Sequence, residues 1–572
     1  MEPIKPVCNM KICGWSFSIY LFCLSLFGCN GRGDQAELQR ELQSIDLFRG
    51  DIAMCGSGET QFGTVDFNFS CSEKMKSDFN LGTALLHSFE YEDAEKVFAK
   101  VIDEEPTCLM AYWGVAMSNF HPLWAPPSKE ELEKGSRIIA LARTLESNDR
   151  REIDYLEAVA TMFDNWTSLD HKTRLQKFEI ASEQLYKKYP GDTEAAIFYA
   201  LALKAAADPT DKTFAKQRKA GEILNDLFSK HPDHPGVAHY IIHTFDSPEL
   251  AELGLPAARK YASIAASSAH ALHMPSHIFV RLGLWEESAQ SNLNSMEAAR
   301  CYAENQGMNA HWDEEMHGLD YLVYAYLQQA NDDKAKGQLD YLDSIHNISP
   351  LTFKVAYSLA AVPTRYALER KDWARATSLS LTPSEFPWEN FPWERSIVSF
   401  GKVLGAVHTR NADLAQGALQ ELRNNHAALE KMKKLYEANQ VQIQIMASEA
   451  WIALMQGKKD DAVRLMRKAA DMEDATEKHP VTPCEVIPAR ELLGDMYMEL
   501  GQFKEALNAY ETDLKGHAGR LNALVGATMA SLKAGDLEKT RKYLKEMDTG
   551  IPLYDVERPS VLEVRALAKT KV

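Results

Sequence analysis

The stretch LGTALLHSFEYEDAEKVFAKVIDEEP, at residues 81–106, contains the pattern that decides the fold of this chain. Its apolar residues recur at helical spacing on both sides of a short polar break, which predicts two consecutive helices. Small residues at Gly82 and Ala94 let these helices approach closely, while Leu81 and Phe98 fill the space toward their neighbours. Pro106 ends the second helix, because proline cannot continue it. The stretch is therefore one helix-turn-helix unit.

The same unit returns along most of the chain. Its spacing is that of the tetratricopeptide repeat (TPR), whose signature combines Leu-Gly, Ala, Phe and a closing proline in a 34-residue period. The strongest second copy contains Leu493, Gly494, Tyr497, Gly501, Phe503, Ala506 and Tyr510. Further copies surround Ala220, Gly283, Ala335, Gly457 and Gly535. We therefore predict an all-α fold, a TPR-type solenoid that winds as a right-handed superhelix with a concave face.

Longer phrases extend the resemblance beyond the generic repeat. HPGVAHYIIHTFD, HALHMPSHIFVRLGLW, HGLDYLVYAYLQ and ARELLGDMYMELG resemble a family of exported bacterial TPR proteins. The resemblance covers almost the whole chain after its first residues. It implies a helical repeat and export, and it transfers no catalytic residue.

Composition changes along the chain predict four parts. Residues 1–29 form a lipoprotein signal peptide, 30–70 a glycine-rich tether and irregular lead-in, 71–548 the helical repeat array and 549–572 a C-terminal tail. Lys5 and Lys11 precede an apolar run that ends in Leu-Phe-Gly-Cys, which resembles the bacterial lipobox. Cys29 would then carry a lipid that anchors the exported protein to the membrane, on its periplasmic face or at the cell surface. An ordinary signal peptide with a chance cysteine is the alternative.

Charge and cysteine content restrict the partners and the compartment. The net charge is −18 and no lysine/arginine cluster offsets it, which argues against nucleic acid as a partner. Export implies an oxidising compartment, where disulfides persist. Cys71 has two candidate partners, Cys108 across a helical hairpin and Cys55 across a loop. The odd number of cysteines after Cys29 leaves at least one free thiol.

Histidines crowd into one window of the array. Eight of the 17 histidines lie between residues 234 and 317. His239 and His243 are four residues apart, so they project about 40° from each other on one helical face. We expect that a divalent transition metal can bind among these side chains. Zinc and iron are the first candidates, and nickel and copper are the others. The candidate ligands are His239, His243, His270, His273, His277, His311 and His317.

Pro275 interrupts this window and allows two structures. Either a helix begins near Pro275 and leaves residues 270–274 extended, or the helix is kinked there. The alternative to a metal is that the histidines only satisfy helix ends and the groove rim by hydrogen bonds. We assign that structural role to His87, His121 and His231, and a turn to His234.

No pattern in the sequence indicates an enzyme class. The two-histidine motif lacks the glutamate of HExxH, and no nucleophile lies beside a base, so a binding role is favoured over an enzymatic one. We expect a protein or peptide partner in the concave groove, held by aromatic residues. The functional hypothesis is an interaction scaffold in the bacterial cell envelope. The alternatives are a metal-binding protein and an accessory lipoprotein of a polysaccharide-utilisation system. The groove candidates are Trp113, Trp312, Tyr321 and Tyr324, and Trp124 is a further one.

Overall fold

The computed structural model describes residues 38–56, 61–123, 125–551 and 558–571. The predicted signal peptide with its lipidation site Cys29 lies outside these ranges, as does Trp124. The described chain is built almost entirely of helices, so the predicted all-α helical repeat fold is confirmed.

The first half of the chain forms helices from residue 38 onward. A short helical stretch at residues 38–43 comes first. It is followed by η1 (Glu73–Met75), α2 (Lys76–His87), α3 (Tyr91–Glu104), α4 (Leu109–Ser118), α5 (Lys129–Ala142), α6 (Arg150–Ala160), α7 (His171–Lys188), α8 (Thr193–Ala205), α9 (Ala215–Lys230), α10 (Pro235–Phe245), α11 (Ala251–Ile264), α12 (Ala269–His273) and α13 (Pro275–Leu282).

The second half continues the helical array with two very short strands, which pair in parallel as β1 and β2. Its elements are α14 (Trp285–Asn305), β1 (His311–Trp312), α15 (Asp313–Gln328), α16 (Asp332–Ser344), β2 (Ile348–Ser349), α17 (Phe353–Glu369), α18 (Trp373–Thr377), η2 (Trp388–Asn390), α19 (Pro392–His408), α20 (Ala412–Lys431), α21 (Leu435–Met455), α22 (Lys459–Asp474), α23 (Ala489–Glu499), α24 (Phe503–Gly516), α25 (Leu521–Ala534), α26 (Leu537–Gly550) and α27 (Pro559–Lys571).

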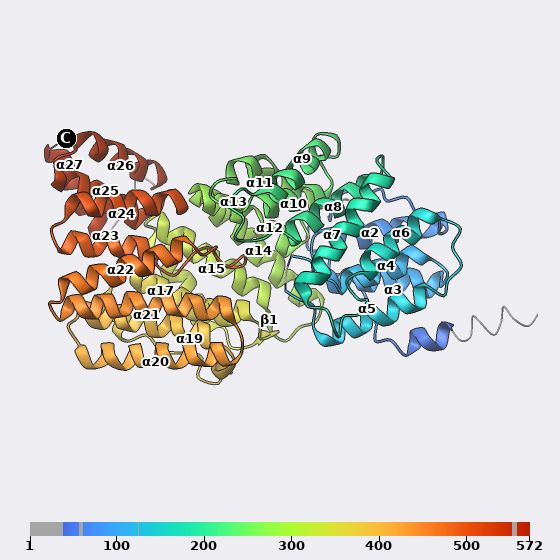
Figure 1. Cartoon of the computed structure of the whole chain (residues 1–572), viewed down its shortest axis with the longest axis horizontal. Coiled ribbons are helices and arrows are strands. Elements are labelled where there is room, and N and C mark those ends of the chain that lie inside the picture. The colour runs from blue at the N-terminus through green and yellow to red at the C-terminus, as the bar shows by residue number, and fades with distance from the viewer. Residues whose placement is uncertain (1–37, 57–60, 124, 552–557, 572) are drawn as a thin grey trace, which may run out of the picture.

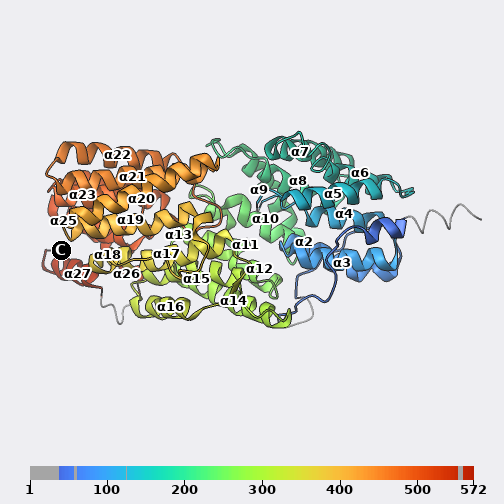
Figure 2. The same ribbon diagram turned by 90° about the horizontal axis from the view of Figure 1, so that it is seen from below.

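The helices stack along the long axis of the molecule. Both ribbon views place the first helices at one end, the last helices at the other and α10 to α15 between them (Figures 1 and 2). Consecutive helices pack against each other, as the helix-turn-helix pattern predicts. The histidine-bearing helices therefore occupy the middle of the array.

Glycines and aromatic rings explain why the repeats pack so closely. A Cβ atom added to Gly82 or Gly114 would meet the Phe98 ring at 3.0 and 2.4 Å. In the second strong copy of the repeat, a Cβ atom on Gly494 would meet the Tyr510 ring at 2.5 Å. An aromatic ring of the second helix thus lies against bare backbone of the first. The small residue predicted at this repeat position has this steric cause.

The apolar interior divides into two large clusters that meet at the histidine stretch. One runs from Leu42 to Phe279 and the other from Ala289 to Val564. A small cluster between them contains Trp285, Tyr321, Tyr324 and two further residues. The histidine stretch spans residues on both sides of this division.

The two segments predicted to flank the array both take part in packing. In the lead-in predicted at 30–70, Leu42 and Phe67 are buried in the first apolar cluster. At the other end, α27 lies within the predicted tail and packs against α25 and α26.

Two disulfides connect distant parts of the chain. Cys71 pairs with Cys108, and Cys55 pairs with Cys301 on α14. The alternative pairing of Cys55 with Cys71 is therefore not formed. Cys484 is a buried free thiol.

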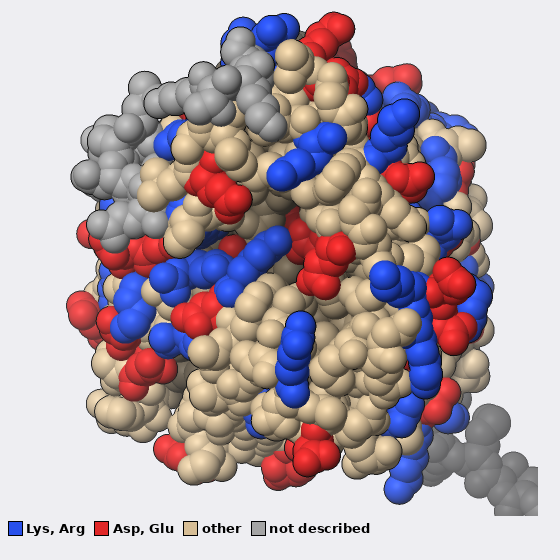
Figure 3. Space-filling view, turned by 90° about the vertical axis from the view of Figure 1, so that its left-hand side faces the viewer, with Lys and Arg blue, Asp and Glu red and all other residues tan. Residues whose placement is uncertain are grey.

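The surface at the C-terminal end of the molecule is mixed in charge. Lysine, arginine, aspartate and glutamate side chains are interspersed over this face, around a hollow near its centre (Figure 3). Within the described ranges, no helix is both long enough and apolar enough to cross a lipid bilayer.

Candidate metal centre

Three helical segments carry the histidines into the middle of the molecule. Pro235 opens α10 at its first turn, where a missing amide hydrogen costs nothing, and His239 and His243 follow on one face. The Ser268 side chain caps α12, which ends at His273. Met274 keeps helical dihedrals between α12 and α13, so the helix is kinked at Pro275. The extended alternative for residues 270–274 is therefore wrong.

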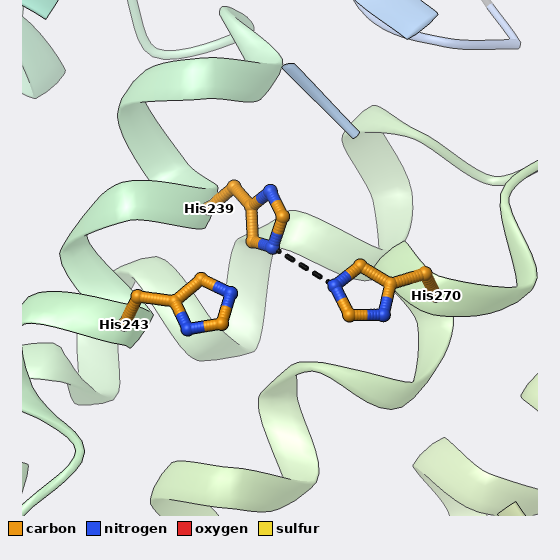
Figure 4. Close-up of side chains that lie close together, drawn as sticks. All are labelled: His239, His243 and His270. Carbon is orange, nitrogen blue, oxygen red and sulfur yellow. Dashed lines mark hydrogen bonds between the residues drawn. The ribbon is translucent and has the colours of Figure 1, made fainter. Parts of the chain in front are cut away.

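His239, His243 and His270 form the first group. One ring nitrogen from each lies within 4.8 Å of the others. The Nε2 atoms of His239 and His270 are 3.2 Å apart, and the three rings point toward one another from α10 and α12 (Figure 4). His239 and His270 are buried and His243 is half-buried. The Nε2 atom of His243 is buried without a hydrogen-bond partner among the described residues.

His273, His277 and His317 form the second group, and all three are buried. The Nε2 atoms of His273 and His277 are 3.1 Å apart. His317 reaches them from α15, with its ring centroid 4.1 Å from that of His273. The hydroxyl of Tyr321 lies 3.5 Å from Nε2 of His277. This group therefore joins α12 and α13 to α15 in the second half of the array.

Hydrogen bonds fix the tautomers of His273 and His277. The Asn292 amide nitrogen donates to the Ser288 carbonyl at 2.7 Å, so its Oδ1 faces His273 Nδ1 at 2.7 Å as an acceptor. The Asp246 carboxylate accepts from His277 Nδ1 at 3.0 Å. Both Nδ1 atoms must therefore carry the proton. The two Nε2 atoms consequently aim lone pairs at each other.

The same reasoning applies to His239. Its Nδ1 lies 2.6 Å from the carbonyl oxygen of His87, which can only accept, so Nε2 of His239 carries a lone pair toward the first group. A histidine whose Nδ1 donates to a carbonyl or carboxylate is typical of metal ligands, because that bond orients the ring and leaves Nε2 for the ion.

Burial keeps these imidazoles neutral. It lowers the pKa of His239 to about 3, and it lowers the pKa of His277 against the opposing effect of Asp246. The pKa values of His243, His270, His273 and His317 fall well below the usual range, first through burial and then through neighbouring positive charges. Neutral imidazole is the form that binds a metal.

The spacing of the nitrogens also suits a metal. Two imidazole nitrogens at about 2.0–2.1 Å from one tetrahedral zinc ion lie about 3.3 Å from each other. The closest Nε2 pairs of the two groups are 3.2 and 3.1 Å apart. The groups are also adjacent, because the ring centroids of His243 and His277 are 6.4 Å apart. The arrangement can hold two ions side by side.

His311 does not join either group, contrary to the sequence prediction. It lies on β1 before α15, and its side chain is 34% exposed. Its Nδ1 is 2.7 Å from a carboxylate oxygen of Glu315. His317 lies within α15 and is buried. His311 precedes this helix, in β1, where it pairs with Ile348 of β2.

The aromatic residues predicted to line a groove lie in other environments. Trp113 is 2% exposed and packs edge-on against Phe198 in the first core, so its assignment to a groove is wrong. Tyr324 is equally buried, beside Trp285. Tyr321 contacts the second histidine group. Trp312 alone of the four is half-buried, and it stacks on Tyr302.

Sequence reasoning missed a third cluster beside the first group. His87 and His234, assigned to structural and turn roles, approach the two oxygens of one buried carboxylate, that of Glu194, at 2.9 and 2.8 Å. Tyr240 completes the cluster through its hydroxyl, 3.0 Å from Nδ1 of His87. Position in the repeat gave no signal, because His87 ends α2, whereas His243 and His277 lie before the ends of α10 and α13.

Comparisons with known proteins give only distant likenesses. No family model and no curated protein matches the chain. Among solved structures, the human IFIT1 dimer with m7Gppp-AAAA aligns with 84% of this chain and 95% of its own, at 12% identity and a TM-score of 0.33. A monomeric IFIT1 mutant with Gppp-AAAA aligns with 90% and 99%, at 13% identity and a TM-score of 0.35. At these values nothing about ligands is transferred to this chain.

Proposed function

We propose that this chain is a metalloprotein that holds two transition-metal ions, zinc or copper, in its two adjacent three-histidine groups. The observation that carries the proposal is the pair His273 and His277, whose Nε2 lone pairs face each other at 3.1 Å. Such a pair is repulsive unless a cation lies between the two nitrogens. Burial disfavours a proton there, and a metal ion satisfies both nitrogens at once.

The donor set selects the metal. Each group offers three imidazoles and neither contains a carboxylate or a thiolate. Imidazole-only sets suit zinc and copper, and affinity for nitrogen sites is greatest for copper. Non-haem iron, which the sequence also suggested, typically takes two histidines with one carboxylate.

Three protein ligands for each metal ion favour a catalytic centre over a structural one. Structural zinc sites are closed by four protein ligands, whereas catalytic sites leave a position for water or substrate. Two neighbouring ions with open positions can bind one ligand between them. We therefore propose an enzymatic role for the centre.

Elemental analysis tests this function. The full chain, expressed without a histidine tag and purified without chelators, is expected to contain about two equivalents of zinc or copper per chain. His239→Gln/His243→Gln should lose one equivalent, and His277→Gln/His317→Gln should lose the other. The control His231→Gln/His346→Gln changes two exposed histidines and should keep both equivalents. A wild-type chain that carries no metal, and takes up neither ion at micromolar concentration, would disprove the proposal.

We also propose that the protein is exported and lipid-anchored at Cys29. The basic start, the apolar run and the lipobox-like sequence support this. The disulfides Cys55–Cys301 and Cys71–Cys108 suit an oxidising compartment. Metabolic labelling with a clickable palmitate analogue should mark the wild type and leave Cys29→Ser unlabelled. Equal labelling of both would refute the anchor.

The scaffold and polysaccharide hypotheses receive less support. Trp113, Tyr321 and Tyr324 are at most 2% exposed, so three of the four predicted peptide contacts are not available on a surface and only the half-buried Trp312 remains. The polysaccharide role rests on no described residue. Partner capture becomes the next experiment only if the elemental analysis finds no metal.

A further inference from the structure

A cleft of about 640 Å³ reaches the histidine centre at one point. Residues of both halves of the array line it, from α8, α10 and α13 on one side and from α24 and the segment before α23 on the other. Of the six histidines in the two groups, only His243 lies in the cleft wall. A small molecule in the cleft can therefore approach the first group without disturbing the buried second group.

Cations gather at the part of the cleft wall next to His243. Arg281 donates from Nε to Asp246 Oδ1 at 2.8 Å, and Lys478 Nζ lies 3.6 Å from Asp246 Oδ2. The Lys478 side chain is only 6% exposed. Asp246 also accepts the hydrogen bond from His277, so one carboxylate serves two cations and a histidine. It cannot neutralise them all.

Lys204 adds a further positive charge on the same wall. Within the described part of the chain, no carboxylate lies within 4.0 Å of its ammonium group, although Lys204 is half-buried. Burial lowers its pKa most and Arg281 lowers it further, against the raising effects of Asp246 and Glu477, so its ammonium form has only partial compensation. An anion bound between Lys204 and Lys478 would supply the remainder.

The acidic residues that face the cleft are largely engaged elsewhere. Glu485 and Asp513 both contact His517, at 3.1 and 2.9 Å, and they raise its pKa well above the usual range. Glu477 pairs with Lys212 at the rim, at 3.3 Å. Burial raises the pKa of Glu473 well above its usual range, which disfavours its charged form. The wall beside His243 is therefore more positive than the cleft as a whole.

We propose that this cleft binds a small molecule through an oxyanion group, a carboxylate or a phosphate, held by Lys204 and Lys478 and directed toward the metal ion at His243. The inference rests on the proposed metal centre and names the ligand class of that same site. Two divalent ions on six neutral imidazoles would bring four positive charges into a buried region, and an anionic ligand offsets them. A volume of this size accommodates a small organic molecule.

Calorimetric titration of the metal-loaded full chain tests the inference, with inorganic phosphate and succinate as separate probes. At least one probe is expected to bind saturably, and the one that binds more tightly identifies the oxyanion. Lys478→Met and Lys204→Met keep most of the apolar side-chain length and remove the charge. Each should weaken binding by about tenfold or more, the effect of losing one hydrogen bond to a charged group. The control is Lys212→Met, at a 55% exposed rim position, which should bind like the wild type.

Metal content, measured in the same samples, separates the two proposals. Wild-type protein with two equivalents of metal and no binding of either probe overturns the anion site and leaves the metal centre standing. Lysine variants that bind as tightly as wild type also overturn the anion site. Wild-type protein without metal overturns the metal centre and, with it, the inference drawn from it.

Discussion

Two clusters of buried histidines lie close together and differ in one respect. His87 and His234 share the carboxylate of Glu194, which faces a ring nitrogen of each. His273 and His277 have no carboxylate between them, and their Nε2 atoms face each other at 3.1 Å. In the first cluster the carboxylate contacts both histidines, although Nδ1 of His234 is buried without a hydrogen-bond partner among the described residues. In the second cluster the two Nε2 lone pairs face each other.

The difference is the basis on which we propose a metal site at one cluster and not at the other. Burial is common to both clusters, and so is the convergence of three ligand atoms within 4.8 Å. What separates them is the charge at the centre. The pKa of Glu194 is held well below its usual range by His234 and His87, so the anion needed to balance the cluster is already present. No such anion lies within the other cluster.

Metal removal should have the largest effect, and it tests directly whether the second histidine group holds a cation. Chelator-treated protein is expected to lose about 4 kcal/mol of unfolding free energy for each bound ion, relative to protein in metal at a thousandfold excess over Kd, because a ligand bound only to the folded state stabilises it. Urea denaturation of both forms measures the loss. His273→Gln/His277→Gln, which disrupts the second group and leaves the first intact, should respond to chelator about half as strongly. A wild type indifferent to chelator would contradict the expectation.

Glu194→Gln should be the next largest change. It removes the anion between His87 and His234, and losing the hydrogen bonds of a buried charged group costs about 3 kcal/mol. Since the folded pKa of Glu194 is depressed, its contribution is full above the unfolded pKa and is lost as pH falls through the folded pKa. Urea denaturation at pH 7 and in acid should show the deficit shrink in acid. The control Glu222→Gln, at an exposed helical position, should match wild type throughout.

Glu90→Gln should give a smaller effect of opposite sign. Burial raises the pKa of Glu90 to about 8, and the Ser268 hydroxyl donates to it at 2.5 Å. A raised carboxyl pKa makes the wild type lose stability as pH rises from the unfolded value through 8. The neutral variant escapes this loss, so it should exceed wild type by roughly 1 kcal/mol at pH 8, after allowance for partial exposure. A variant less stable than wild type at pH 8 would show that Glu90 is ionised in the folded state.

His311→Ala should have the smallest effect. It tests whether His311 lies outside the set of metal ligands. The substitution removes one partly exposed hydrogen bond to Glu315, so stability should change by no more than about 1 kcal/mol. Metal content should stay at the wild-type value, since His311 belongs to neither group. Loss of one metal equivalent would show that His311 is a metal ligand after all.

Much of the fold was predictable because the repeat is defined by residues close together in the sequence. Spacing in residues 81–106 predicts two helices, and the small residue at Gly82 predicts their close approach. The Phe98 ring does lie against that glycine. Helical spacing likewise places His239 and His243 on one face, and both belong to the first group. Each of these inferences uses contacts within one helix or between successive helices.

The membership of the centre was decided only by tertiary structure. Helical periodicity predicts which residues share one face of a helix, but it does not predict which neighbouring helix that face packs against. His270 turns toward α10 while His273, three residues later, turns toward α15. The division arises because α12 packs between α10 on one side and α15 on the other.

Partners from distant positions then determine the chemistry. Asn292 and Asp246 fix the tautomers of His273 and His277, and the carbonyl of His87 fixes that of His239. By itself, the sequence determined the helices and the faces on which the histidines lie. Packing between repeats decided which histidines meet, which nitrogens carry protons and which aromatic residues are buried, because these depend on contacts between residues far apart in the chain.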